Sequence, residues 1–148
     1  LGIVTPAAAT SISFSDVPVT HWAYPYVQTA SENGWIAGIG DNLFGIDDQV
    51  TYAQLSTMLV RAFYNDEYES YTGQTDSWFS AFTGVADNEG LFYGTSADGK
   101  AQDGATVNQP VNRYEMAQMM YNILASKGAV PEYNSASVQA GIADWDIK

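Results

Sequence analysis

The chain has 148 residues, of which 46% are hydrophobic and 14% aromatic, so it is long and apolar enough to bury one sizeable core. It carries 17 acidic and 5 basic residues, and the formal net charge of -12 argues against binding to nucleic acid or to an anionic membrane surface. The absence of cysteine excludes disulfides and thiolate metal sites, and no run of 18 apolar residues could span a bilayer.

Residues 1–13 are expected to form a flexible N-terminal segment outside the packed part of the chain. The small residues Ala7, Ala8 and Ala9 are typical of a secretory cleavage site, so this segment could be the remnant of a signal peptide. No basic region precedes them, and the alternative is an unstructured terminus. Both interpretations stay open at this point.

Residues 14–65 are predicted to form a first repeat that contains two helices. Thr20 can cap the first helix, and apolar side chains follow it at helical spacing: Trp22, Tyr26 and Ala30. Because these side chains share one face, we expect Trp22, and Trp78 at the matching position of the second copy, to pack into the core with one edge exposed. The alternative, which is compatible with partial burial, is that the two indoles stack on the face of a sugar.

A proline and a glycine limit this first helix. Pro25 would remove a backbone hydrogen bond and clash with the preceding turn, so the helix has an irregular first turn or begins later. Gly34 is placed to end the helix in the left-handed conformation. The second helix is predicted to begin after Thr51, because Thr51 followed by Gln54 forms a capping box.

Residues 66–127 repeat this pattern as a second unit. Trp78 follows Trp22 by 56 residues, and four further positions recur in the same register: Tyr26 with Phe82, Ala30 with Ala86, Gly34 with Gly90, and Gly38 with Gly94. The second helices also share an apolar stripe, formed by Leu55, Met58, Leu59, Ala62 and Phe63 in one copy and by Met116, Met119, Met120, Ile123 and Leu124 in the other. Since one repeat cannot bury its apolar face alone, we expect both stripes to form one shared core.

The second unit departs from the first in its caps and loops. Asn112 with Glu115 replaces the Thr and Gln of the capping box, and the loop before this helix is five residues longer. The polar segments 64–74 and 126–139 are predicted to be linkers. Residues 128–148 are then a linker followed by the start of a truncated third repeat.

Together these residues resemble the S-layer homology domain of bacterial envelope proteins over nearly the whole chain. The first copy carries the resemblance in Phe14, Ser15, Asp16 and Val17, in His21, Trp22 and Ala23, and in Gly34, Gly38, Phe44, Val50 and Thr51. The family begins its second helix with an aliphatic residue, Thr, Arg, Ala and Glu. The second copy gives Val111, Asn112, Arg113, Tyr114 and Glu115, whereas the first has Tyr52 and Gln54 in place of Arg and Glu. The second copy lacks the Phe, Ser, Asp entry and has Tyr71, Thr72 and Gly73 instead.

The resemblance implies an all-α fold of tandem helix-loop-helix repeats, packed in a bundle with pseudo-three-fold symmetry when three repeats are present. It implies an extracellular protein in the bacterial cell wall or S-layer. Its function would be the non-covalent anchoring of a secreted protein to anionic secondary cell-wall polysaccharide, which is often pyruvylated. Carried over residue by residue, the family's ligand-binding groove corresponds to Asp16, Trp22, Gly38, Trp78, Gly94 and Arg113.

Among these, Arg113 has a physical reason to bind an anion. It lies at the start of a helix, beside free backbone N–H groups and the positive end of the helix dipole. The alternative is an ion pair with one of the many acidic residues. Because a net charge of -12 gives no long-range attraction to an anionic polymer, affinity would depend on short-range contacts.

We predict no catalytic residue, metal site or cofactor. His21 is the only histidine, and neither a second imidazole nor a thiolate is present to build a zinc site or to position a catalytic base. The loop carboxylates of Asp41, Asp47, Asp48, Asp98 and Asp103 match no complete calcium-binding loop. No spacing singles out two acids for glycoside hydrolysis.

Two other functions stay open. The repeats could be a degenerate module for protein–protein interaction or self-assembly in the envelope, because Tyr52 and Gln54 depart from the family pattern and two repeats leave one side of a three-fold core uncovered. The missing third repeat could cover that side. The other alternative is a wall-active glycoside hydrolase, which would release fragments from purified peptidoglycan.

Overall fold

The computed structural model describes residues 13–130, and within this range it contains six helices and no strand. The helices are α1 (Tyr24–Glu32), α2 (Tyr52–Phe63), α3 (Asn65–Glu69), α4 (Ser80–Asn88), α5 (Gly104–Val107) and α6 (Arg113–Ser126). The all-α prediction is confirmed. The pseudo-three-fold arrangement and the repeat boundaries stay predictions. The possible signal remnant and the third repeat fall outside the described residues.

Helix α1 begins late, as the proline predicted. Pro25 lies in the first turn, where its missing N–H costs nothing, and no side chain caps the helix. The expectation that Thr20 is the cap is therefore wrong. Gly34 and Gly90 end α1 and α4 with φ of 72° each, and the residues that follow them bond back to the helix through Trp35 N–H to Ala30 O (2.9 Å) and Leu91 N–H to Ala86 O (2.8 Å). Both predicted helix ends are confirmed.

The capping predictions for α2 and α6 are also confirmed. The Thr51 hydroxyl accepts from Gln54 N–H at 3.2 Å, and the Gln54 side chain accepts from Thr51 N–H at 3.0 Å. Asn112 accepts from Glu115 N–H at 2.9 Å. Asparagine and threonine at these positions thus satisfy backbone donors that the helix itself leaves free.

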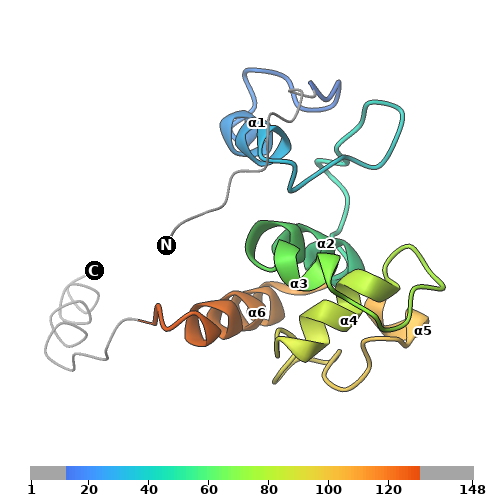
Figure 1. The fold of residues 1–148 in the computed structure, drawn as a ribbon. Coiled ribbons are helices and arrows are strands. Elements are labelled where there is room, and N and C mark those ends of the chain that lie inside the picture. The colour runs from blue at the N-terminus through green and yellow to red at the C-terminus, as the bar shows by residue number, and fades with distance from the viewer. Residues whose placement is uncertain (1–12, 131–148) are drawn as a thin grey trace, which may run out of the picture.

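The described chain has two hydrophobic cores. In Figure 1, α1 lies apart from the group formed by α2 to α6. The smaller one surrounds α1 and contains Phe14, Val17, Ala23, Val27 and Ile36. The larger one joins α2 and α4 to α6 and includes side chains of both predicted stripes: Leu55, Leu59, Met119 and Ile123. The prediction of a shared core is confirmed for these residues.

Other stripe residues lie elsewhere. Met58 packs against the smaller core, so α2 contributes to both. Met120 and Leu124 are 39% and 37% exposed, and their predicted burial is wrong. The reason is geometric, because α6 buries the i, i+4, i+8 face of Glu115, Met119 and Ile123, and the adjacent side chains point away from it.

The segment 64–74 is not the linker that its polar composition predicted. It contains α3, and its aromatic side chains recur at a spacing of about one helical turn and face the core. Tyr64 is buried, and its hydroxyl lies 2.6 Å from the Ser126 hydroxyl. Tyr68 stacks on Phe82 with ring centroids 4.4 Å apart. The aromatic period rather than the polar content decides the local structure here.

The longer loop of the second repeat forms a short helix, α5. Asp103 caps it by accepting from Ala105 N–H at 3.1 Å, and Val107 on this helix is fully buried. The longer loop therefore contributes to the larger core. Within residues 13–130, no helix has the length and apolar character needed to cross a membrane.

Candidate functional site: a groove between the two repeats

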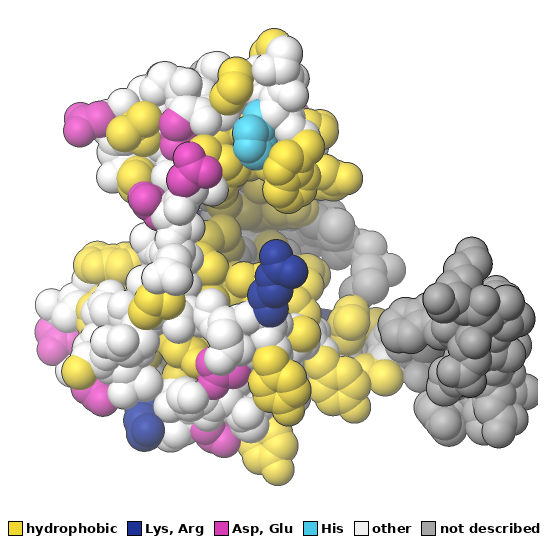
Figure 2. All heavy atoms as spheres, turned by 180° about the vertical axis from the view of Figure 1, so that it is seen from behind, with side chains coloured by type: hydrophobic (Ala, Val, Ile, Leu, Met, Phe, Trp, Pro, Cys, Tyr) yellow, Lys and Arg dark blue, Asp and Glu magenta, His cyan; other side chains and the backbone are white. Residues whose placement is uncertain are grey.

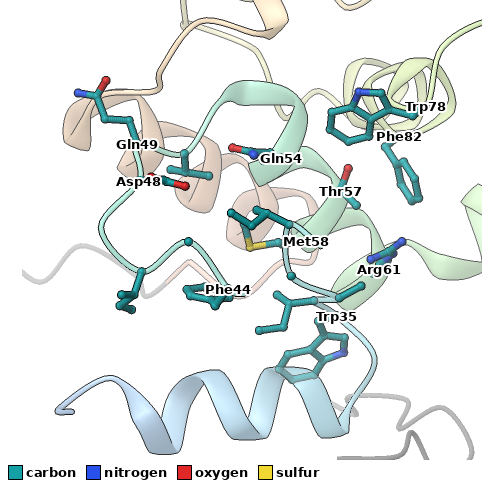
Figure 3. Close-up of a pocket in the computed structure, with 17 residues that line it drawn as sticks. Trp35, Phe44, Asp48, Gln49, Gln54, Thr57, Met58, Arg61, Trp78 and Phe82 are labelled. Atoms are coloured by element: carbon teal, nitrogen blue, oxygen red, sulfur yellow. The ribbon is translucent and has the colours of Figure 1, made fainter. Parts of the chain in front are cut away.

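A groove of about 620 Å³ lies between the segment that follows α1, the outer face of α2 and the start of α4. Figure 3 shows Trp35 and Phe44 on one side and Trp78 and Phe82 on the other, with side chains of α2 between them. Its polar lining comes from Asp48, Gln49, Gln54, Thr57 and Arg61. Aromatic walls with a few polar groups are typical of sites for small ligands.

Asp16 stabilises the loop that forms one wall of the groove. Its carboxylate accepts three backbone N–H groups of the loop, from Phe44 (2.8 Å), Gly45 (2.7 Å) and Ile46 (3.1 Å). These bonds, led by the one from Phe44, hold the pKa of Asp16 below its usual value because they stabilise the carboxylate. Asp16 does not line the groove itself, and its visible role is to fix the loop that does.

Gly38 lines the groove and shapes the same loop. Its φ is 77°, and a Cβ at this position would meet the carbonyl oxygen of Leu43 and the ring of Phe14. Glycine is thus required both for the left-handed conformation and for the close approach of the backbone.

Replacing Gly38 by Ala is expected to lower the free energy of unfolding by roughly 1 to 3 kcal/mol, because the variant must move the loop or the Phe14 ring. The matched control is Gly90→Ala, since Gly90 has a similar φ of 72° but open space where the Cβ would lie. Urea unfolding followed by circular dichroism measures both. A loss at Gly38 no larger than at Gly90 would contradict the close-packing argument.

The two repeated tryptophans are both surface residues. Trp22 is 78% exposed and Trp78 is 60% exposed, so the prediction that they fill the core is wrong. Trp22 precedes the first turn of α1, whose buried face is carried by Ala23 and Val27 instead. Trp78 lines the groove, whereas Trp22 does not.

Trp22 belongs to a separate aromatic patch. Its ring centroid lies 5.8 Å from that of His21 and 6.4 Å from that of Tyr26, which is 70% exposed. Figure 2 shows hydrophobic side chains gathered beside the histidine, which is coloured cyan. The patch is therefore available to a partner, but it is distinct from the groove.

Arg113 and Gly94 also lie outside the groove lining. Arg113 is exposed at the first position of α6, and it forms no ion pair with any acidic residue within 13–130. Gly94 has φ of 78°, and its N–H donates to the Asp98 carboxylate at 3.2 Å. Of the six predicted ligand-binding residues, the structure thus brings Gly38 and Trp78 together in one groove. Asp16 stabilises a loop of this groove through hydrogen bonds.

Sequence reasoning missed Arg61. This residue lies on α2, lines the groove, and holds its guanidinium carbon 5.2 Å from the centre of the Phe82 ring. It is the sole basic residue in the groove lining, and it pairs with no carboxylate in the described part of the chain. A signal was available, because Gln54, Thr57 and Arg61 form a polar stripe at helical spacing beside the apolar one.

The comparisons with known proteins agree with the sequence pattern. Residues 13–56 match the model of the S-layer homology domain. The resemblance to the S-layer homology family is confirmed. An S-layer protein of Bacillus thuringiensis subsp. finitimus is 26% identical over 80% of this chain and 14% of its own length. The S-layer protein sap of Bacillus anthracis is 25% identical over the same shares. No solved structure matches the chain.

The family model covers residues 13–56, which are most of the predicted first repeat, and the S-layer proteins are similar to most of the chain, including much of the second repeat. The S-layer homology match and the similarity to these S-layer proteins indicate an extracellular location in the cell wall or S-layer. An endoglucanase of a Bacillus species is 28% identical over 84% of the chain but only 14% of its own length. The chain spans about one-seventh of the length of these relatives.

Proposed function

We propose that this chain anchors a secreted protein non-covalently to the bacterial cell wall by binding an anionic secondary polysaccharide, such as a pyruvylated one. The observation that carries the proposal is the groove, which combines exposed indole surface with a cation that has no acidic partner in the described chain. The S-layer homology match supports the cell-wall part of the proposal.

The chemistry of the lining suits a charged sugar. The groove volume of about 620 Å³ falls within the range for small-molecule sites. The Trp78 ring offers an apolar face on which the C–H side of a sugar ring can pack. Gln49, Gln54 and Thr57 can exchange hydrogen bonds with hydroxyls, and Arg61 can bind an acidic substituent through two parallel N–H groups.

The acidic surface makes this binding short-range. A chain of net charge -12 repels a polyanion at a distance, so the cation must act at contact, inside a groove where water is partly excluded. Trp22, Gly94 and Arg113 would form further contacts outside the groove. Arg113→Ala and Trp22→Ala in the assay below test that part of the prediction.

Co-sedimentation with Bacillus wall fragments, either intact or stripped of secondary polymer, tests the proposal. The chain is expected to pellet with intact walls only. Trp78→Ala should weaken binding by about twofold to tenfold, because one aromatic contact contributes about 0.5 to 1.5 kcal/mol beyond the area that it buries. Tyr121→Ala is the control, since Tyr121 is a 53% exposed aromatic residue outside the groove. Equal binding to stripped walls would contradict the proposal.

The alternative of a protein-interaction module has its own observation. The outer side of α6 exposes a continuous set of apolar side chains: Tyr114, Met120, Tyr121 and Leu124. Exposed apolar patches of this kind mark protein contacts in many soluble proteins. In the same assay, an interaction module would lose its partner through Tyr121→Ala and would not distinguish intact from stripped walls.

A further inference from the structure

We propose that Arg61 gives the groove its preference for an anionic ligand, and that Phe82 and Tyr68 are positioning residues that hold the Arg61 guanidinium at the groove wall. This inference deepens the proposed function and rests on it. It concerns residues from three different helices, α2, α3 and α4, none of which belongs to the predicted set of ligand-binding residues.

The three side chains form a layered contact. The rings of Tyr68 and Phe82 are nearly parallel, at an interplanar angle of 5° and a centroid distance of 4.4 Å. The Arg61 guanidinium lies over the Phe82 ring at 5.2 Å. Because Tyr68 covers one face of the Phe82 ring, it fixes the surface on which the guanidinium rests. Figure 3 shows Arg61 and Phe82 on the same side of the groove.

This arrangement leaves the charge of Arg61 available. An arginine that already pairs with a carboxylate loses most of its attraction for an anionic ligand, but no described acidic residue pairs with Arg61. A contact with an aromatic face restricts the side chain without neutralising it. The ligand therefore meets a cation whose rotamer freedom is already reduced, which lowers the entropic cost of binding.

Arg61 also supplies a positive charge to the first repeat, which has no cation at the start of its second helix. At the start of α2, where the second repeat has Arg113, the chain has Tyr52, which is 2% exposed and donates its hydroxyl hydrogen to Glu115. Tyr52 therefore cannot reach a ligand in the groove.

The second repeat has no cation at the position that corresponds to Arg61. Alignment of Val50 with Val111 pairs Arg61 with Asn122. The Asn122 amide donates to the backbone oxygens of Leu91 and Tyr93, each at 2.9 Å, so it fixes a loop instead of offering a charge. The preference for an anion at this helical position is thus specific to the first repeat.

The test measures binding to Bacillus wall sacculi that carry their secondary polymer, either untreated or with carboxylates converted to amides. Arg61→Gln should bind untreated sacculi about tenfold to a hundredfold more weakly, because a charge-assisted hydrogen bond is lost. Tyr68→Leu should weaken binding about twofold to fivefold by freeing the guanidinium, and Tyr68→Phe should bind like the parent because it keeps the stack. Lys100→Gln, which removes an exposed cation outside the groove, is the charge control.

Amidation identifies the source of the anion. If amidation abolishes the difference between parent and Arg61→Gln, the group bound is a carboxylate; if the difference survives, it is a phosphate. A purely structural role of Tyr68 would lower the melting temperature without changing the salt dependence of binding, whereas a positioning role reduces that dependence. Parent-like binding by Arg61→Gln overturns the proposal, and parent-like binding by a folded Tyr68→Leu overturns the positioning role. A parent that binds no sacculi refutes the proposed function itself.

Discussion

Replacing Met119 by Asp is expected to unfold the chain. Met119 is fully buried in the larger core, where it lies among side chains contributed by both repeats. Burying a charge without a partner costs several kcal/mol, which is comparable with the whole free energy of unfolding of a domain of this size, about 5 to 15 kcal/mol. Circular dichroism should show loss of the cooperative melting transition or a large fall in its midpoint.

The neighbouring residue provides the control. Met120 is 39% exposed, so Met120→Asp is expected to change the free energy of unfolding by no more than about 0.5 kcal/mol. The apolar stripe alone predicted that both methionines are buried. A variant Met119→Asp that melts at the temperature of the parent, or a Met120→Asp that unfolds, would show that α6 packs through a different face.

The elements that could be predicted from the sequence are those with local chemistry. A capping residue and its partner three positions later fix the start of a helix, and a left-handed glycine fixes its end, so the starts of α2 and α6 and the ends of α1 and α4 were predictable. Helix α3 was not predictable, because most of its residues are polar and only the aromatic spacing of Tyr64 and Tyr68 indicates a helix.

The groove could be predicted only in part, because it is built from segments far apart in the sequence. Trp78 was found from its repetition, and Gly38 from the family pattern. Their relation to Arg61 depends on how α2 packs against α4, which no local motif encodes. Repetition alone does not give the environment of a side chain, since Tyr52 and Arg113 stand at matching positions of the two repeats but Tyr52 is buried and Arg113 is exposed.

Tyr52 belongs to a hydrogen-bond network that joins the two repeats. Their second helices begin side by side, with Val111 N–H donating to Val50 O at 2.9 Å. The buried carboxylate of Glu115 then accepts from the Tyr52 hydroxyl, from Ser96 N–H (2.8 Å) and Oγ (2.6 Å), and from the Asn112 amide (2.8 Å). Burial, with the neighbouring carboxylate second, raises the pKa of Tyr52 to about 12, so its hydroxyl stays a donor.

The hydrogen bonds to Glu115, led by that of the Ser96 side chain, hold the pKa of this carboxyl below its usual value. A pKa that is lower in the folded than in the unfolded chain means that the bonds stabilise the fold at neutral pH. This stabilisation is fully present above the unfolded pKa and is lost as the pH falls through the folded pKa. The hydrogen-bond network between the repeats is therefore expected to weaken in acid.

Glu115→Gln should lower the free energy of unfolding at pH 7 by about 1 to 3 kcal/mol, because an amide cannot accept all these donors and leaves some of them buried without a partner. The difference between parent and variant should shrink as the pH is lowered, since protonation imposes the same loss on the parent.

Urea unfolding at pH 7 and at successively lower pH measures this difference, and the subtraction removes the contribution of Asp16, whose pKa is also lowered by its hydrogen bonds. Ala125→Glu is the control, because it adds a carboxylate to an exposed position of α6 that is ten residues away from Glu115. A difference that stays constant down to strongly acidic pH would show that the charge of Glu115 does not stabilise the contact between the repeats.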